Sequence, residues 1–291
     1  MNYLLPNSRF CCIIILYSYG VMLMKYKLIA ADIDGTLLNP HRELTERTIK
    51  AVRAVMEKGA YFVLSSGRMP PALLGIAKEL KVNAPAVCYN GGALVDVIEN
   101  KTLFSTPVPI DLAVAVAKEC EEMGLYLHAF VHGGYIAPEF NALTKDYQKL
   151  CGVKAEVVNG KISEHIDEAP MKLLVLDTPE GAAKALPLLK EKFGGRANLM
   201  HSQKHMIECV DKRTSKAGAL EFLRKKLNID IADTCAFGDG QNDLDMLRWA
   251  GTAFVMDNAP DSVKTASPDF TIVPSNAEDG VAQTLERLLE E

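Results

Sequence analysis

The 291-residue sequence contains no C-x-x-C pair, no histidines at metal-ligand spacing and no excess of basic residues. Its seven cysteines are odd in number and most lie inside apolar runs, so we expect free thiols and a reducing, cytoplasmic setting. The formal net charge of -5 argues against a nucleic-acid binder, because little would neutralise a phosphate backbone. A small anionic substrate stays compatible with this charge, since a local pocket can be positive on an acidic protein.

A run long enough to span a membrane is also missing. Residues 10–24 are almost wholly apolar, but they fall short of the roughly 20 residues that cross a bilayer. Arg9 precedes this run as in a signal peptide, yet no A-x-A-like cleavage site follows it. We therefore expect residues 1–24 to be an upstream extension, with translation starting at Met22 or Met24, rather than a membrane anchor.

The chain that follows alternates apolar runs with amphipathic segments. Residues 28–31 form a continuous apolar run, which is typical of a strand buried on both faces. Thr45 is suited to cap the helix that follows, and the runs 61–64 and 86–89 predict two more strands with a helix between them. This βαβαβ order predicts a parallel sheet with helices on both faces.

The same alternation returns near the C-terminus, after a middle segment of different texture. There strands are expected at residues 234–237, 252–255 and 270–273. The middle segment has enough strands and helices for an independent α+β layer, in which we expect His128 and His132 on the surface. The sequence thus predicts an α/β fold, a Rossmann-like doubly wound parallel sheet core with an inserted α+β cap domain. The core would comprise residues 25–108 and 212–291, and the cap residues 109–211.

Two polar clusters follow the first two predicted strands, where ligands collect in an open parallel sheet. The first is Asp32-Ile33-Asp34-Gly35-Thr36-Leu37, in which one carboxylate can attack phosphorus while the other protonates the leaving group. The second is Ser66-Gly67-Arg68, a hydroxyl with backbone amides suited to a phosphoryl oxygen. The first cluster favours phosphoryl transfer, whereas the Ser-Gly pair of the second is by itself equally a turn signal.

Two further clusters lie in the C-terminal half. Lys216, at a predicted helix start, could neutralise the nucleophile and the phosphoryl charge, although a single lysine there is usually solvated. The run from Gly238 to Asp243 follows a predicted strand, and its acidic side chains are hard oxygen ligands suited to Mg²⁺. An EF-hand calcium loop would need a longer ligand series and a closing Glu, which this run lacks.

In this order the four clusters resemble the motifs of the haloacid dehalogenase-like superfamily of phosphotransferases, over residues 25–291. The segment Tyr89-Asn90-Gly91-Gly92-Ala93 looks like the Y-N-G-A segment of Cof-type phosphatases of subclass IIB, with Gly92 as an extra residue. Ser66 stands where threonine is commoner, and Lys216-Ala217-Gly218 replaces the more usual lysine-glycine pair. The likeness implies a Cof-type subclass IIB enzyme.

The position of the insert agrees with that subclass. Too few residues separate Asp32 from Ser66 to hold a further domain. Between Ser66 and Lys216 there are roughly a hundred residues more than a βαβ continuation needs. The resemblance therefore implies a type-IIB α/β cap between the second and third motifs.

The resemblance also implies the chemical roles. Asp32 would be the nucleophile and a Mg²⁺ ligand. Asp34 would be the general acid and base, with its backbone carbonyl on the metal. Ser66 and Lys216 would hold the phosphoryl group, with the Gly67 backbone nearby.

The fourth motif would complete the metal site. Asp239 would ligate Mg²⁺ directly. Asn242 and Asp243 would support the phosphate and the groups around the metal. The implied metal set is thus Asp32, Asp34, Asp239 and Asp243.

The activity implied is that of a Mg²⁺-dependent phosphatase acting on small phosphate monoesters through an aspartyl-phosphate, with sugar phosphates or phosphorylated cofactors as substrates. A phosphomannomutase-like phosphotransferase or a sucrose-phosphatase-like enzyme has the same motifs and cap type. A phospho-aspartate signalling receiver is a distant alternative, but its phosphorylated Asp lies on a later strand than its acidic pair. We expect the binding partner to be a small phosphorylated metabolite, and we expect neither a nucleic acid nor a membrane to be bound. The oligomeric state stays open.

Overall fold

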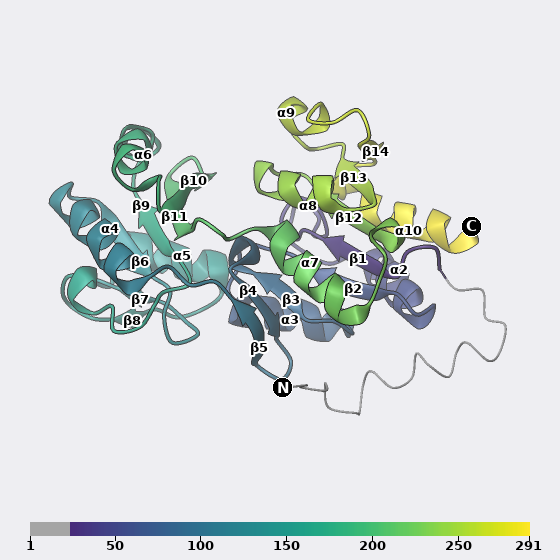
Figure 1. Ribbon diagram of the computed structural model, residues 1–291, viewed down its shortest axis with the longest axis horizontal. Helices are drawn as coiled ribbons and strands as arrows, with labels where there is room; N and C mark the ends of the chain where they lie inside the picture. Colours follow the sequence, from purple (N-terminus) through teal and green to yellow (C-terminus); the bar gives the residue numbers. More distant parts are fainter. Residues whose placement is uncertain (1–23) are drawn as a thin grey trace. The chain divides into compact units, whose positions relative to one another are not determined.

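The computed structural model describes residues 24–291, which form two compact units (Figure 1). The first unit takes in the described residues up to 65 together with 76–85 and 220–291, and the second comprises 66–75 and 86–219. The extension expected at residues 1–24 lies outside the described residues, apart from Met24. None of the described helices is long and apolar enough to cross a membrane. The core and cap limits expected from the sequence stay a prediction.

A five-stranded parallel sheet forms the centre of the first unit. Its order is β14-β13-β12-β1-β2, and every neighbouring pair is parallel. The strands are β1 (Leu28–Ala31), β2 (Tyr61–Leu64), β12 (Thr234–Gly238), β13 (Thr252–Met256) and β14 (Thr271–Val273). The apolar runs of β1 and β12 are buried along their whole length, as expected of central strands. The predicted Rossmann-like core is confirmed.

Helices complete the first unit. They are α2 (Glu46–Glu57), α8 (Leu244–Trp249), α9 (Asp261–Lys264) and α10 (Gly280–Glu290). Arg47 of α2 and Glu286 of α10 form an ion pair with Nη2 and Oε2 2.5 Å apart, so the first and last helices of this unit lie together. Two more helices, α3 (Pro70–Leu80) and α7 (Lys216–Leu227), contribute residues to both units.

Thr45 caps α2, as its sequence predicts, and offers a test of this packing. Its Oγ1 accepts the N–H of Thr48 at 3.1 Å and donates to Asp279 Oδ1 at 2.7 Å. Thr45→Ala should therefore lower the free energy of unfolding by about 1–2 kcal/mol, measured by urea unfolding. Thr45→Ser keeps the hydroxyl and should lose less than half of that amount. Equal losses for the two variants would show that the methyl group, not the cap, matters.

The first sheet of the second unit differs from the sequence prediction. The strand expected at 86–89 is β3 (Ala86–Cys88), and it pairs antiparallel with β4 (Ala93–Asp96), which pairs antiparallel with β5 (Lys101–Ser105). The physical reason is the left-handed backbone at Tyr89, Asn90 and Gly91, with φ of 54°, 56° and 97°. These residues turn the chain back at once, so β3 forms a local hairpin instead of a third parallel strand.

The other sheet of the second unit has six strands in the order β10-β11-β9-β6-β7-β8. Its strands are β6 (Tyr126–Ala129), β7 (Ile136–Ala137), β8 (Glu156–Val157), β9 (Leu173–Leu176), β10 (Ala197–Gln203) and β11 (Met206–Asp211). All pairs are antiparallel except β7 with β8. The mixture of strands and helices agrees with an α+β layer.

Three strands of this six-stranded sheet, β6, β9 and β11, are buried on both faces along nearly their whole length. One face packs Leu127, Val175 and Ile207 against α4 (Ile110–Glu122) and α6 (Pro179–Phe193). The other face carries His128, Leu174 and Glu208, which are opposite one another in register and all buried. Helix α5 (Ala142–Cys151) covers part of this second face through Tyr147, whose ring centroid lies 5.4 Å from that of His128.

The expectation that His128 lies on the surface is wrong. The side chain is fully buried among Tyr126, Tyr135 and Tyr147, because both faces of its sheet are covered. Burial lowers the pKa of His128 to about 3, so the ring stays neutral at physiological pH. The side chain of His132 is 49% exposed, as expected, and its Nε2 lies 3.1 Å from Asp167 Oδ1.

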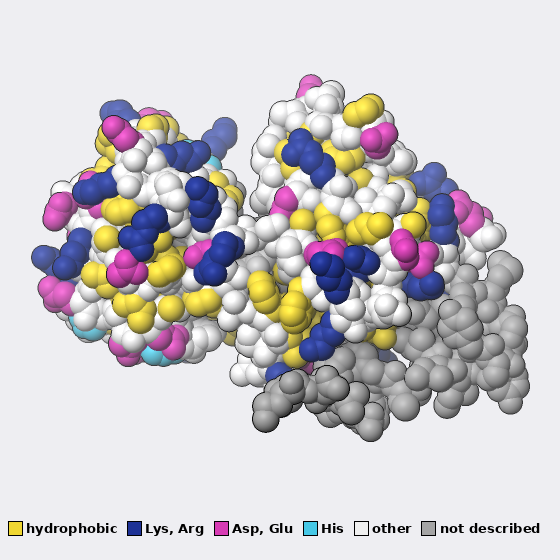
Figure 2. All heavy atoms as spheres, viewed as in Figure 1, with side chains coloured by type: hydrophobic (Ala, Val, Ile, Leu, Met, Phe, Trp, Pro, Cys, Tyr) yellow, Lys and Arg dark blue, Asp and Glu magenta, His cyan; other side chains and the backbone are white. Residues whose placement is uncertain are grey.

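Charged side chains of both signs are interspersed over the described surface in Figure 2. On the face shown, Lys and Arg side chains have Asp and Glu neighbours on both units.

Candidate active site

The site begins where the central strands of the parallel sheet end. Strand β1 runs directly into Asp32, and its neighbour β12 runs into Asp239. The N–H of Asp32 donates to the carbonyl of Phe237 at 3.0 Å, which continues the parallel pairing one residue beyond β1. Because the carboxyl ends of parallel strands meet at one edge, the two aspartates become neighbours.

Three carboxylates gather at this edge. One oxygen each from Asp32, Asp239 and Asp243 lie within 4.8 Å of one another, and we call these three residues the acidic cluster. Asp32 is 6% exposed and Asp243 is fully buried. Asp243 arrives from the 3₁₀ turn Gln241–Asp243, four residues after Asp239. The structure therefore brings together three of the four residues assigned to the metal from the sequence.

Neighbouring groups fix the acidic cluster. Thr36 Oγ1 donates to Asp239 Oδ1 at 2.8 Å. Asp243 Oδ2 accepts the backbone N–H groups of Asp239 and Gly240 at 3.1 and 2.8 Å. A Cβ at position 35 would lie 2.4 Å from Asp239 Oδ2, and φ at Gly35 is +90°. Glycine is thus required at position 35 both by its backbone conformation and by the closeness of Asp239.

The donor set fits Mg²⁺. Carboxylates this close repel one another, and two of the three are buried, so a cation is the natural partner for them. All donors are hard oxygens, without histidine or thiolate ligands, which suits Mg²⁺ rather than zinc or copper.

The Asp34 carboxylate lies outside the acidic cluster. Its Oδ1 accepts from Arg42 Nη2 at 3.2 Å, and its side chain is 46% exposed. An exposed carboxylate is placed to exchange protons with solvent or a substrate. Arg42 could not be predicted from the sequence, because an arginine in the loop after the first motif carries no pattern of its own.

The predicted phosphate-binding residues Ser66, Gly67 and Lys216 belong to the second unit. Ser66 is 2% exposed, and its Oγ accepts the N–H of Arg68 at 3.2 Å. Lys216 is 1% exposed, which corrects the expectation that a lysine at a helix start is solvated. A buried ammonium needs anionic or polar partners, so burial strengthens the case that this lysine has a specific role.

The Tyr89-Asn90-Gly91 turn ties these residues together. The N–H of Asn90 donates to the carbonyl of Ser66 at 3.0 Å. A Cβ on Gly91 would lie 2.1 Å from the carbonyl oxygen of Ser215, so this glycine packs directly against the backbone that enters Lys216. Within the second unit, one turn thus contacts both the Ser66 loop and the start of α7.

Asn242 belongs to the first unit, in the same 3₁₀ turn as Asp243. Its side chain is exposed, unlike that of Asp243. The structure therefore gathers Asp32, Asp239 and Asp243 in the first unit and Ser66, Gly67 and Lys216 in the second.

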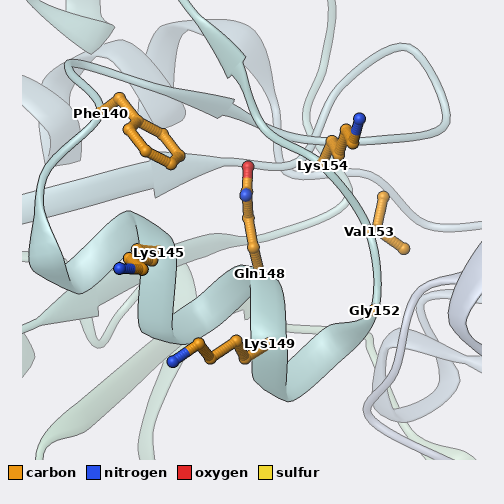
Figure 3. A pocket seen from close by; sticks show the side chains of 7 residues that line it. All are labelled: Phe140, Lys145, Gln148, Lys149, Gly152, Val153 and Lys154. Atoms are coloured by element: carbon orange, nitrogen blue, oxygen red, sulfur yellow. The ribbon is translucent and has the colours of Figure 1, made fainter.

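A separate pocket of about 460 Å³ lies beside α5 in the second unit (Figure 3). Exposed Phe140 and the lysines Lys145, Lys149 and Lys154 line it. Gln148 stands at its centre and accepts the N–H of Ala155 at 2.8 Å. None of its lining residues belongs to a predicted motif, and the three ammonium groups in Figure 3 do not converge on one point.

Known proteins are similar to this chain over most of its length. A model of the haloacid dehalogenase-like hydrolase family matches residues 29–285. A protein of Haemophilus influenzae named "Putative phosphatase" is 27% identical, covering 91% of this chain and 97% of that protein. A Buchnera aphidicola protein of the same name is 30% identical, and the match covers 90% of this chain and 95% of that protein.

Solved structures show the same fold. A crystal structure of a Thermotoga maritima protein is 30% identical with a TM-score of 0.80, covering 90% of this chain and 97% of that one. A haloacid dehalogenase-like hydrolase from Bacteroides thetaiotaomicron is 26% identical with a TM-score of 0.82. The match covers 90% of this chain and 99% of that one. Both likenesses extend over the two units described above.

Proposed function

The chain belongs to the haloacid dehalogenase-like hydrolase family, and on that premise we propose that it is a Mg²⁺-dependent phosphatase of the Cof type. Its substrates would be small phosphate monoesters, hydrolysed through an aspartyl-phosphate on Asp32. The observation that carries the proposal is the acidic cluster at the ends of adjacent strands β1 and β12. Relatives with the name "Putative phosphatase", which match this chain over nearly their whole length, support phosphatase activity.

Asp32 and Asp34 would share the chemistry. A carboxylate oxygen of Asp32 forms a bond to phosphorus while the bond to the leaving oxygen breaks. Asp34 gives that oxygen its proton, and then takes a proton from the water that attacks the aspartyl-phosphate. Water attack returns Asp32 as a free carboxylate and releases inorganic phosphate. The Asp34 side chain is 46% exposed, so the leaving oxygen and the attacking water can reach it.

Ser66, Gly67, Lys216 and Asn242 would hold the phosphoryl group. Ser66 can donate its hydroxyl hydrogen, because its oxygen already accepts the N–H of Arg68. Lys216 would offset negative charge in the transition state, with the Gly67 backbone and Asn242 as further donors.

The Asp32 carboxylate, the Asp34 carbonyl and the Asp239 and Asp243 carboxylates would hold the ion, directly or through water. When bound, Mg²⁺ supplies positive charge that lowers the repulsion between the nucleophile and the phosphoryl oxygens. Thr36 and the amides that donate to Asp243 would keep these carboxylates in place before the metal arrives.

A cytoplasmic location is part of this proposal. The described cysteines are free, and four of them, Cys88, Cys120, Cys209 and Cys235, are buried. Burial raises the pKa of both Cys120 and Cys209 to about 12, so these thiols stay protonated. Free, buried thiols are the usual form of cysteine in a reducing compartment.

The test is a turnover screen with Mg²⁺ present, using p-nitrophenyl phosphate, hexose and pentose phosphates, flavin mononucleotide and pyridoxal phosphate. We expect release of inorganic phosphate from p-nitrophenyl phosphate and from some of the metabolites, with sugar phosphates first. No phosphate release from any of them would overturn the proposal. Transfer of phosphate to another position of the sugar, without its release, would instead identify the phosphomannomutase-like alternative.

A further inference from the structure

A buried ion pair on the six-stranded sheet belongs to none of the sequence motifs. Lys172 immediately precedes β9, and Glu208 lies in β11. Lys172 Nζ and Glu208 Oε1 are 2.7 Å apart, and the two side chains are only 3% and 7% exposed. Both lie on the face opposite α4 and α6, because they follow the same alternation as Leu174 and His128.

Each member of the pair also reaches beyond its sheet, Lys172 to the Ser66 loop and Glu208 to the turn at Asn90. Lys172 Nζ donates to the carbonyl of Gly67 at 3.2 Å. Glu208 Oε2 accepts from Asn90 Nδ2 at 3.0 Å. The ammonium also lies 4.6 Å from the centre of the Phe130 ring, within the range of a cation–π interaction. All of these residues belong to the second unit.

The two segments held by the pair contact each other as well. The N–H of Asn90 donates to the carbonyl of Ser66 at 3.0 Å. A Cβ on Gly67 would lie 2.9 Å from Asn90 Nδ2, so the amide packs on the bare backbone of this glycine. Gly67, Lys172, Glu208 and Asn90 thus form a closed chain of contacts around the Ser66 loop.

Stability alone is a poor explanation for this pair. Removing two ions from water is costly, and replacing both members of a buried pair with apolar residues is often neutral or stabilising. The pair is therefore better explained by what it holds in place than by the stability that it adds.

The Gly67 carbonyl is the important contact, because it belongs to the same rigid peptide plane as the N–H of Arg68. Lys172 fixes the oxygen of that plane, and the N–H on its other side donates to Ser66 Oγ. With one of its two lone pairs engaged by this N–H, the Ser66 hydroxyl can turn its hydrogen toward a phosphoryl oxygen. A rotation of the Gly67–Arg68 plane would remove that arrangement.

We propose that Lys172 and Glu208 are positioning residues that set the Ser66–Arg68 loop for phosphate binding. The proposal rests on the proposed function, in which Ser66 holds the phosphoryl group. Lys172 acts through the Gly67 carbonyl, and Glu208 acts through Lys172 and Asn90. Neither touches the substrate, and the six-stranded sheet thereby controls the affinity of the enzyme for phosphate.

The experiment compares the full chain with a Lys172→Met, Glu208→Met double variant, which removes both charges and keeps two unbranched side chains. We expect a folded protein whose inhibition constant for inorganic phosphate rises about tenfold, as for one weakened hydrogen bond to a charged group. KM for p-nitrophenyl phosphate should rise with it, while the Mg²⁺ concentration for half-maximal activity stays the same. A general loss of structure would change both.

Two further variants separate the contact with Gly67 from the ion pair itself. Lys172→Glu with Glu208→Lys restores opposite charges but sets a carboxylate against the Gly67 carbonyl, so its phosphate inhibition constant should stay raised. Asp111→Ala with Arg196→Ala removes an exposed ion pair of the same unit, in which Arg196 Nη2 and Asp111 Oδ2 lie 2.6 Å apart. This control should leave the phosphate inhibition constant unchanged.

A folded double-methionine variant with wild-type phosphate inhibition would overturn the proposal. If that variant does not fold, Glu208→Gln, which replaces one carboxylate oxygen with NH₂, takes its place. Its inhibition constant for inorganic phosphate should rise about threefold. An unchanged constant would equally overturn the proposal. A wild-type protein without turnover would overturn the proposed function alone. Calorimetric titration of wild type and variants with phosphate and Mg²⁺ would then test the positioning by binding.

Discussion

Asp32→Asn should lower kcat for p-nitrophenyl phosphate by at least about 10⁴-fold, because an amide cannot attack phosphorus and loss of a covalent nucleophile has effects of this size. The structure supplies the reason for choosing this aspartate. Asp32 is the buried member of the acidic cluster that directly extends a central strand, so its carboxylate is held rigidly at the sheet edge.

The fold should survive this change. The amide has the shape of the carboxylate, and the backbone bond from Asp32 to Phe237 does not depend on the side chain. Removing one of three crowded carboxylates also relieves repulsion, so the thermal midpoint should stay level or rise. Asp269→Asn, an exposed carboxylate before β14, is the matched control and should keep full activity. Near-normal turnover by Asp32→Asn would refute its role as nucleophile.

Asp34→Asn gives a graded companion to this result. Loss of the general acid and base should lower kcat for an alkyl phosphate by about 10²–10⁴-fold. The loss should be smaller with p-nitrophenyl phosphate, because nitrophenolate leaves without help from a proton. An equal loss with both substrates would mean that Asp34 does not protonate the leaving oxygen. The comparison is informative because the exposed Asp34 side chain lies outside the acidic cluster.

Much of the first unit could be predicted from the sequence, because its strands are read from local patterns. The run 28–31 is apolar at every position, and such a run before a polar turn indicates a buried parallel strand. Parallel strands then place Asp32 and Asp239 at one edge without any further information. Thr45 was predictable as a cap for the same reason, since capping is decided within four residues.

The rest depends on contacts between residues far apart in the chain. Strand β3 looks in sequence like the parallel strands of the first unit, and only the left-handed turn at 89–91 sends it into a hairpin. Lys172 and Glu208 are each unremarkable in sequence, and their pairing follows from the register of β9 and β11. The burial of His128 follows from rings contributed by Tyr135 and Tyr147, which no local pattern reveals.

Removing the divalent cation should abolish turnover. With EDTA in excess, activity on p-nitrophenyl phosphate should fall by at least about 10³-fold, because three neighbouring carboxylates would repel an anionic substrate without a metal between them. Added Mg²⁺ should restore it. Mg²⁺ should also raise the thermal midpoint of the wild type, since a ligand that binds only the folded state stabilises it. Activity undiminished by chelation would rule out the metal-assisted reaction.

Gly35 allows the same site to be tested without removing any carboxylate. Gly35→Ala would place a Cβ 2.4 Å from Asp239 Oδ2, and Asp239 is tied to Thr36, so the carboxylate must shift. We expect the Mg²⁺ concentration for half-maximal activity to rise at least about tenfold, as for a displaced ligand or its support. Gly124→Ala separates steric displacement from backbone strain, because Gly124 also has a positive φ of +69° but nothing within 4 Å of the added atom. It should lose stability and keep its Mg²⁺ requirement. If both variants needed the same Mg²⁺ as the wild type, Asp239 would not be a ligand of the catalytic ion.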